Sequence, residues 1–172
     1  MIHLLQAALA LVFPGLVITA ALRDVTSYTI PNWISLALLA AFPPAALALG
    51  LPVAGLGLHL AVGVGALGLG MVMFALGWIG GGDAKLFAAS ALWLGWPAAM
   101  AFGAFTGLAG GVLALSLLTL RSGYLRPYVV TGPAWFARLA EPDENVPYGA
   151  AIAIGALAAF PASPFMKALA GL

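Results

Sequence analysis

Apolar stretches long enough to cross a lipid bilayer recur along the whole chain, and they constrain its fold more than any other feature. Of the 172 residues, 64% are hydrophobic and only 6% are charged. So few charged side chains could not cover the surface of a water-soluble domain. The sequence therefore predicts an all-α integral membrane protein with the lipid bilayer as its main solvent.

Breakers between the apolar runs divide the chain into about six predicted transmembrane helices. They lie at about residues 4–22, 33–49, 53–78, 84–94, 98–120 and 148–160, and the last extends to residue 169 in a longer interpretation. The N-terminus lacks the Lys/Arg-rich start of a cleaved signal peptide, so the first helix is expected to be retained. Residues 1–172 then form a single transmembrane domain, with one polar connection at about 121–147.

The positive charges indicate how these helices are oriented. With six helices, the connections after the first, third and fifth share one side of the membrane. That side carries Arg23, Lys85, Arg121, Arg126 and Arg138, whereas the other side has only Lys167. Because cytoplasmic connections carry the Lys/Arg excess, both termini are predicted to lie outside the cytoplasm.

The composition also excludes several kinds of site. The chain has no cysteine, which excludes disulfides, thiolate metal ligands and a cysteine nucleophile. His3 and His59 lie far apart in predicted spans without an adjacent carboxylate, so we expect no metal and no other cofactor. The net charge of +1 and the lack of a basic tract argue against a nucleic-acid partner.

Two further features have an ordinary structural interpretation. Glycines recur in the third and fifth predicted helices, where small residues let helices pack closely; they are Gly63, Gly65, Gly68, Gly70, Gly103, Gly107, Gly110 and Gly111. In the polar connection, residues 126–139 form either an interfacial amphipathic helix or a solvated loop. The acidic residues at 141–144 form a solvated turn or, alternatively, contact a basic segment of a substrate.

Asp24, at the end of the first predicted helix, is one of only two acidic residues outside this acidic turn. A charged side chain at a membrane edge usually faces the bundle interior or a wet cavity, although it also serves as a simple helix cap. Hydroxyl side chains able to orient a carboxylate follow it: Thr26, Ser27, Tyr28 and Thr29. Pro31 disfavours helical geometry at Ile30 and is suited to begin the second helix. We therefore predict a tight polar hairpin that holds Asp24 at the mouth of the bundle.

Asp83 is the second isolated carboxylate, and it follows Gly80, Gly81 and Gly82. Consecutive glycines at a helix end sacrifice stability, but they permit backbone conformations closed to other residues and let a substrate chain approach the backbone. Asp83 is then expected to start the fourth helix, where the helix dipole favours a carboxylate. A simple N-cap is the alternative. The glycines lead us to expect that Asp83 is mobile and moves into place when the glycine loop closes.

Together, these segments resemble the type IV prepilin peptidases, a family of intramembrane aspartyl peptidases. The run from Gly80 to Asp83, followed by Ala84-Lys85-Leu86, is similar to the GxGD signature in its prepilin-peptidase form. Asp24, six residues before Ile30-Pro31-Asn32, is similar to the other aspartate block of the family. Val146-Pro147-Tyr148-Gly149 resembles an element of the short enzymes that serve tight-adherence (Flp) pili.

The resemblance implies an aspartic endopeptidase whose catalytic pair is Asp24 and Asp83. It also implies an active-site loop of Gly80, Gly81, Gly82 and Lys85, supported by Thr26, Ile30, Pro31 and Asn32. The implied substrate is a prepilin, with a short basic leader before a long apolar helix, cut at the cytoplasmic face of the bacterial inner membrane. Contact with the pilus assembly machinery is also implied.

The chain departs from the bifunctional members of this family. Those enzymes carry paired CxxC motifs in an additional cytoplasmic region and also N-methylate the cleaved pilin. This chain has no cysteine and no room for that region between its first helices, so the resemblance implies peptidase activity alone. Presenilin and signal peptide peptidase relatives carry Tyr-Asp and Pro-Ala-Leu elements, which do not occur here in the expected places.

The chemistry expected of this pair is general acid/base hydrolysis. Two nearby carboxylates cannot both ionise cheaply, so one keeps a proton while the other activates water. Lys85 either stabilises the anionic state of the aspartate pair, pairs with an acidic residue of the substrate or extends to the lipid headgroups. The main alternative is a small proton-coupled transporter or channel subunit that uses the same aspartates, and a purely structural subunit is the third.

Overall fold

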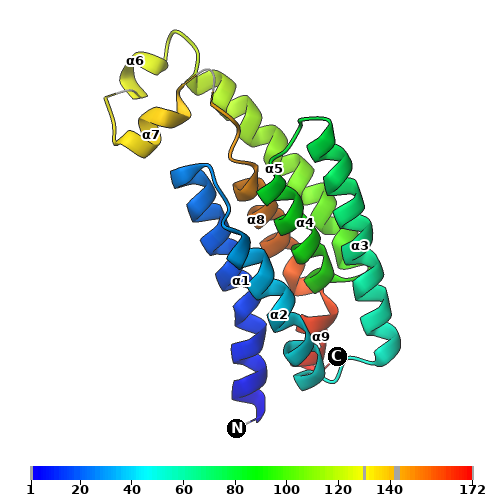
Figure 1. Cartoon of the computed structure of the whole chain (residues 1–172). Helices are drawn as coiled ribbons and strands as arrows, with labels where there is room; N and C mark the ends of the chain where they lie inside the picture. Colours follow the sequence, from blue (N-terminus) through cyan, green and yellow to red (C-terminus); the bar gives the residue numbers. More distant parts are fainter. Residues whose placement is uncertain (1, 130, 142–143, 172) are drawn as a thin grey trace.

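The computed structural model describes residues 2–129, 131–141 and 144–171, without the side chains of residues 2 and 3. The predictions made for the side chain of His3 and for Pro142 and Asp143 therefore lie outside the described residues. Within these ranges the chain is helical and has no strand (Figure 1), which confirms the predicted all-α class.

The helices follow one another as predicted, with some differences at their ends. They are α1 (Ile2–Ser27), α2 (Asn32–Ala48), α3 (Val53–Ala75), α4 (Gly81–Leu94), α5 (Ala98–Leu120), α6 (Arg126–Val129), α7 (Ala134–Leu139), α8 (Tyr148–Ala159), the short 3₁₀ helix η1 (Phe160–Ala162) and α9 (Pro164–Ala170). The third helix was predicted to reach residue 78. It ends earlier because Gly77 adopts a left-handed φ of 74° and closes the helix with its N–H on the Phe74 carbonyl.

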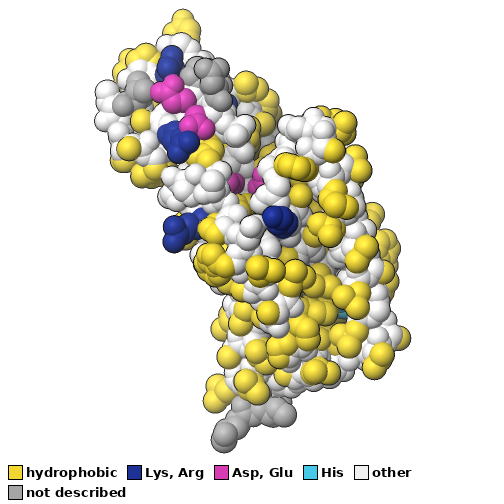
Figure 2. Space-filling model, in the orientation of Figure 1, with side chains coloured by type: hydrophobic (Ala, Val, Ile, Leu, Met, Phe, Trp, Pro, Cys, Tyr) yellow, Lys and Arg dark blue, Asp and Glu magenta, His cyan; other side chains and the backbone are white. Residues whose placement is uncertain are grey.

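Three of the described helices are long and apolar enough to cross a membrane, namely α1, α3 and α5. The pair formed by Tyr148–Ala162 and α9, bent by 41°, gives up to four if it is one span. Large apolar side chains such as Leu11, Val64 and Leu118 are exposed on the three long helices. Figure 2 shows hydrophobic side chains over most of the lower part of the molecule, as expected for a lipid-facing surface.

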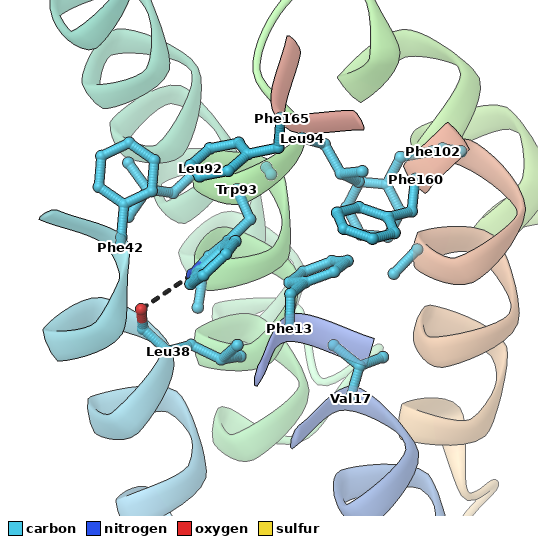
Figure 3. Packing of buried hydrophobic residues seen from close by; sticks show 14 of the residues in the cluster. Phe13, Val17, Leu38, Phe42, Leu92, Trp93, Leu94, Phe102, Phe160 and Phe165 are labelled. Carbon is cyan, nitrogen blue, oxygen red and sulfur yellow. Dashed lines mark hydrogen bonds between the residues drawn. The ribbon is translucent and has the colours of Figure 1, made fainter. Parts of the chain in front are cut away.

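The two short helices α4 and α8 form the interior of the bundle. Most residues of both are buried, and α4 packs against α2, α3 and α8 while α8 packs against α1 and α5. At the C-terminal end of α4, the Trp93 ring stacks on Phe13 at 5.5 Å and on Phe165 at 5.0 Å between centroids. Its indole N–H donates to the Leu38 carbonyl at 2.8 Å (Figure 3). This core fixes one end of α4 and thereby positions the other end, which carries Asp83.

Only some of the glycines in α3 and α5 have the packing role predicted for them. A Cβ on Gly63 would lie 3.0 Å from Leu92 Cβ, and one on Gly70 would lie 3.1 Å from Ala84 Cβ, so both let α4 approach α3. Gly110 makes room for the Tyr148 ring of α8. Gly65, Gly68, Gly103, Gly107 and Gly111 have open space around them, so close packing does not explain them.

The polar parts of the molecule gather at the end opposite the two termini (Figures 1 and 2). The end of α1, the start of α4, the end of α5 and the start of α8 meet there. The polar connection contains two short helices, α6 and α7, instead of one helix over 126–139. The interruption falls at Gly132 and Pro133, and a proline removes the backbone donor that a continuous helix needs.

Candidate active site

Asp24 lies on the last turns of α1, so the prediction that the helix ends at this residue is wrong. The helix continues to Ser27, and its end is set by Tyr28, which has a left-handed φ of 54°. The hydroxyls of Thr26 and Ser27 donate to the carbonyls of Leu22 and Arg23, each at 2.6 Å. These hydroxyls therefore bond to the helix backbone and do not orient the Asp24 carboxylate as predicted.

The group that holds Asp24 comes from a helix more than a hundred residues away. The N–H of Gly149, in the first turn of α8, donates to Asp24 Oδ2 at 2.6 Å. The first N–H groups of a helix have no partner within it, and the helix dipole favours an anion beside them. The Asp24 side chain is thus buried and fixed at the N-terminus of α8.

Residue 149 has to be a glycine for this contact to form. A Cβ at this position would lie 2.8 Å from Asp24 Oδ2 and 2.7 Å from Ile30 Cδ1, both closer than van der Waals contact allows. The element Val146-Pro147-Tyr148-Gly149 stood out in the sequence, but no role for Gly149 was predicted from it. The sequence feature that could have indicated this contact is the glycine at the start of the last predicted helix.

Asp83 lies in the first turn of α4, as its third residue and not as its first. Gly80 is the N-cap, and its N–H donates to Asp83 Oδ2 at 2.9 Å, which is the backbone half of a capping box. Asp83 is 8% exposed, and its Oδ1 is buried without a hydrogen-bond partner among the described residues. One oxygen is therefore held by the backbone, while the other is free to bind a ligand.

Two of the three glycines before Asp83 lie in a helix and not in the loop that was predicted. Gly80 is extended, Gly81 and Gly82 belong to α4, and none of the three has a left-handed φ. A Cβ on Gly82 would lie 3.1 Å from Ile30 Cβ and 3.3 Å from the Ile30 carbonyl oxygen. Ile30 thus contacts Gly82 and Gly149 alike, and the two aspartate segments pack directly against each other.

Asp24 and Asp83 line the same cavity, of about 390 Å³, although they are 59 residues apart in the sequence. Tyr28, Gly80 and Glu144 also contribute to its lining. Figure 2 shows acidic side-chain atoms in the recess between the polar connection and the helix bundle. A cavity of this size accommodates several water molecules or a short stretch of peptide.

Tyr28 lines this cavity, and its hydroxyl does not bond to the Asp24 carboxylate as predicted. Its hydroxyl is buried without a hydrogen-bond partner among the described residues, and the Arg138 guanidinium lies 4.8 Å from its ring centroid. Arg138 also pairs with Glu144. Burial raises the pKa of the Tyr28 hydroxyl, and the Glu144 carboxylate raises it further. Tyr28 therefore remains protonated at neutral pH and can donate a hydrogen bond into the cavity.

Lys85 does not line the cavity of the aspartates, although it was predicted to belong to their loop. Its ammonium donates to Asn32 Oδ1 at 2.9 Å, and both residues line a second cavity on the other side of α4. Pro31 precedes Asn32 as the N-cap of α2. Among the described residues, no cluster of His, Asp and Glu is arranged to hold a metal ion.

A bundle of apolar helices that buries carboxylates around one cavity defines a membrane protein with a polar reaction or transport site. The comparison with known families identifies the particular one. The model of the type IV leader peptidase family matches residues 11–115, which include Asp24 and Asp83, and the chain belongs to this family. Comparisons with curated proteins and with solved structures gave no match. Family membership supports a leader-peptidase function and a prepilin-type substrate in general terms.

Proposed function

We propose that the chain is a membrane-embedded aspartyl endopeptidase that removes the short basic leader of type IV (Flp-type) prepilins, with Asp24 and Asp83 as its catalytic pair. The observation that carries this proposal is the shared cavity, into which two helices distant in sequence each bring a buried carboxylate. Charged groups are expensive inside a membrane protein, and their presence there usually reflects function.

The arrangement suits hydrolysis by a carboxylate pair. In each aspartate a backbone N–H fixes Oδ2, from Gly149 for Asp24 and from Gly80 for Asp83. Because two neighbouring carboxylates in an apolar cavity do not both ionise cheaply, the pair shares a proton and titrates as a unit. The anionic member takes a proton from water, and the protonated member donates to the scissile carbonyl.

The Tyr28 hydroxyl is the second donor in this mechanism. It is buried in the same cavity and stays protonated, so it stabilises the negative charge that develops on the carbonyl oxygen. Arg138 over its ring and the left-handed backbone at residue 28 hold the phenol in place. Tyr28 thus supplies transition-state stabilisation that does not require ionisation of either aspartate.

The location and topology follow from the same proposal. The chain crosses the bacterial inner membrane about six times as a single domain, with α2 and α4 as short spans inside the bundle. Basic residues gather at the end that holds the aspartates (Figure 2), which is the arrangement of a cytoplasmic face. The active site then meets the basic leader in the cytoplasm, near the pilus assembly machinery. The absence of cysteine supports peptidase activity without N-methylation.

Co-expression with a prepilin tests this function. Membranes that contain the chain and an Flp-type prepilin should yield pilin shortened by its leader, and N-terminal sequencing should give one cleavage site without a methylated residue. Unprocessed prepilin in the presence of the folded chain would refute the proposal.

A proton-coupled transporter is the alternative, because buried intramembrane carboxylates also mark ion pathways. Asp24 near the end of α1 and Asp83 at the start of α4 line one cavity, whereas a proton relay needs acidic groups at several depths. Proton uptake into proteoliposomes without leader cleavage would favour the transporter.

A further inference from the structure

Ile30 has a constrained place in the connection between α1 and α2. Tyr28, two residues earlier, ends α1 with a left-handed φ of 54°, and Pro31 directly after Ile30 is the N-cap of α2. A residue before proline is restricted to an extended backbone. Isoleucine is also branched at Cβ, which restricts rotation about its Cα–Cβ bond. The Ile30 side chain is therefore stiff, and the turn sets its direction.

The base and the tip of this side chain contact the two segments that hold the aspartates. A Cβ on Gly82, the residue before Asp83, would lie 3.1 Å from Ile30 Cβ. A Cβ on Gly149, whose N–H donates to Asp24 Oδ2, would lie 2.7 Å from Ile30 Cδ1. Both glycines leave room for Ile30 that a larger residue would fill. The side chain thus reaches from the start of α4 to the start of α8.

We propose that Ile30 is a positioning residue that sets the separation between the Asp24 and Asp83 carboxylates. This inference rests on the proposed function, in which the two carboxylates share a proton in one cavity. Gly82 moves with Asp83 as its neighbour in α4, and Asp24 is tied to Gly149 by the hydrogen bond of 2.6 Å. The length of the side chain at position 30 therefore determines how far apart the two helix starts, and with them the two carboxylates, lie.

The separation matters because one carboxylate must keep its proton while the other is ionised. Repulsion between the two charges grows as they approach, so a shorter separation widens the pH range in which the pair holds a single proton. For charges about 4–6 Å apart at an effective dielectric constant of about 20, one ångström changes this range by about 0.4–0.6 pH unit. The width of the bell-shaped pH profile of kcat reports the range directly.

The first test shortens the side chain without changing its base. Ile30→Val removes only Cδ1, the atom that faces Gly149, and keeps the Cβ that faces Gly82. The start of α8 can then move toward α4, so the pH profile for cleavage of an Flp-type prepilin should widen by about 0.3–0.5 pH unit. Ile34→Val removes the same atom from a buried residue of α2 and is the matched control, which should lower thermal stability without changing the width.

The other groups around the pair are the same in all these variants. Among the described residues, the other titratable groups that line the cavity are Tyr28, Tyr148 and Glu144, and Arg138 pairs with Glu144. A difference in width between Ile30→Val and Ile34→Val therefore reports the aspartate pair. An unchanged width in Ile30→Val, or an equal change in both variants, would overturn the proposal.

The second test restores the spacing from the other side. In the double variant Ile30→Val, Gly149→Ala, the new methyl group takes the space that Cδ1 leaves. The double variant should therefore have a higher Tm than Gly149→Ala alone, about threefold or more of its kcat/KM, and the profile width of the unsubstituted chain. A double variant no better than Gly149→Ala in Tm and in cleavage would show that the two residues do not compete for one space, and would also overturn the proposal.

The two proposals fail in different ways. If the unsubstituted chain does not cleave the prepilin, the proposed function fails, and the Tm values still decide whether Ile30 keeps the starts of α4 and α8 apart. If the chain cleaves the prepilin and the profile width does not follow the size of the residue at position 30, the positioning role of Ile30 alone is refuted.

Discussion

The contact between Gly149 and Asp24 predicts a large effect for the smallest available substitution, Gly149→Ala. The added methyl group would lie 2.8 Å from Asp24 Oδ2 and 2.7 Å from Ile30 Cδ1. Asp24 belongs to the packed interface between α1 and α8 and is buried, so its carboxylate cannot move freely. The start of α8 must therefore shift away from Asp24, and the hydrogen bond of 2.6 Å from the Gly149 N–H lengthens or breaks.

The magnitude follows from the strength of that bond. A hydrogen bond to a charged group contributes about 1.5–3 kcal/mol. Losing it from the catalytic geometry should lower kcat/KM by roughly 10- to 150-fold, because about 1.4 kcal/mol corresponds to a factor of ten. Overpacking should also lower the free energy of unfolding by about 1–3 kcal/mol.

The assay is leader cleavage by purified protein in detergent, with thermal unfolding measured in parallel. Gly111→Ala is the matched control, since a Cβ there has nothing within 4 Å. Its kcat/KM should stay within about twofold of the value for the unsubstituted chain. It should also stabilise α5 slightly, because alanine favours helix more than glycine does. If Gly149→Ala cleaves as fast as Gly111→Ala, the N-terminus of α8 does not hold Asp24 in the reactive arrangement.

Three other substitutions test the Tyr28 donor, the packing of Gly82 against Ile30 and the core around Trp93 separately. Tyr28→Phe removes the buried donor and should lower kcat by about tenfold or more with little change in KM; an unchanged kcat would remove Tyr28 from the mechanism. Gly82→Ala places a Cβ 3.1 Å from Ile30 Cβ, so we expect a loss of severalfold in cleavage, and no loss would mean that Ile30 yields freely. Trp93→Phe removes the hydrogen bond to the Leu38 carbonyl and should cost about 1–2 kcal/mol in unfolding experiments. Its specific activity should change little, since Trp93 lies at the other end of α4 from Asp83.

The helices could largely be predicted from the sequence, because prolines and glycines separate the apolar runs. The ends of α1 and α3 were missed for a physical reason. Charged residues mark where an apolar run ends, but a helix ends where its backbone changes conformation. In α1 that change comes at Tyr28, after Asp24, and in α3 at Gly77.

The two aspartates were also recognisable, because isolated acidic residues are rare in so apolar a chain. What holds each of them was not. The contact between Gly149 and Asp24 joins residues 125 positions apart in the sequence, and no local sequence pattern predicts such a contact. The side of α4 on which Lys85 lies could in principle be derived from helical periodicity. That required knowing that α4 begins at Gly81, so that Asp83 and Lys85 share its first turns.

Cleavage by the two aspartate variants tests the central claim most directly. Purified Asp24→Asn and Asp83→Asn are compared with the unsubstituted chain on one prepilin, and Glu141→Gln serves as a control because Glu141 pairs with Arg126. General acid/base groups contribute about 10²- to 10⁴-fold, so each aspartate variant should lose at least about 100-fold in kcat while remaining folded. The Glu141→Gln variant should cleave normally. A folded Asp24→Asn or Asp83→Asn protein that removes the leader at a rate close to that of the unsubstituted chain would contradict the account.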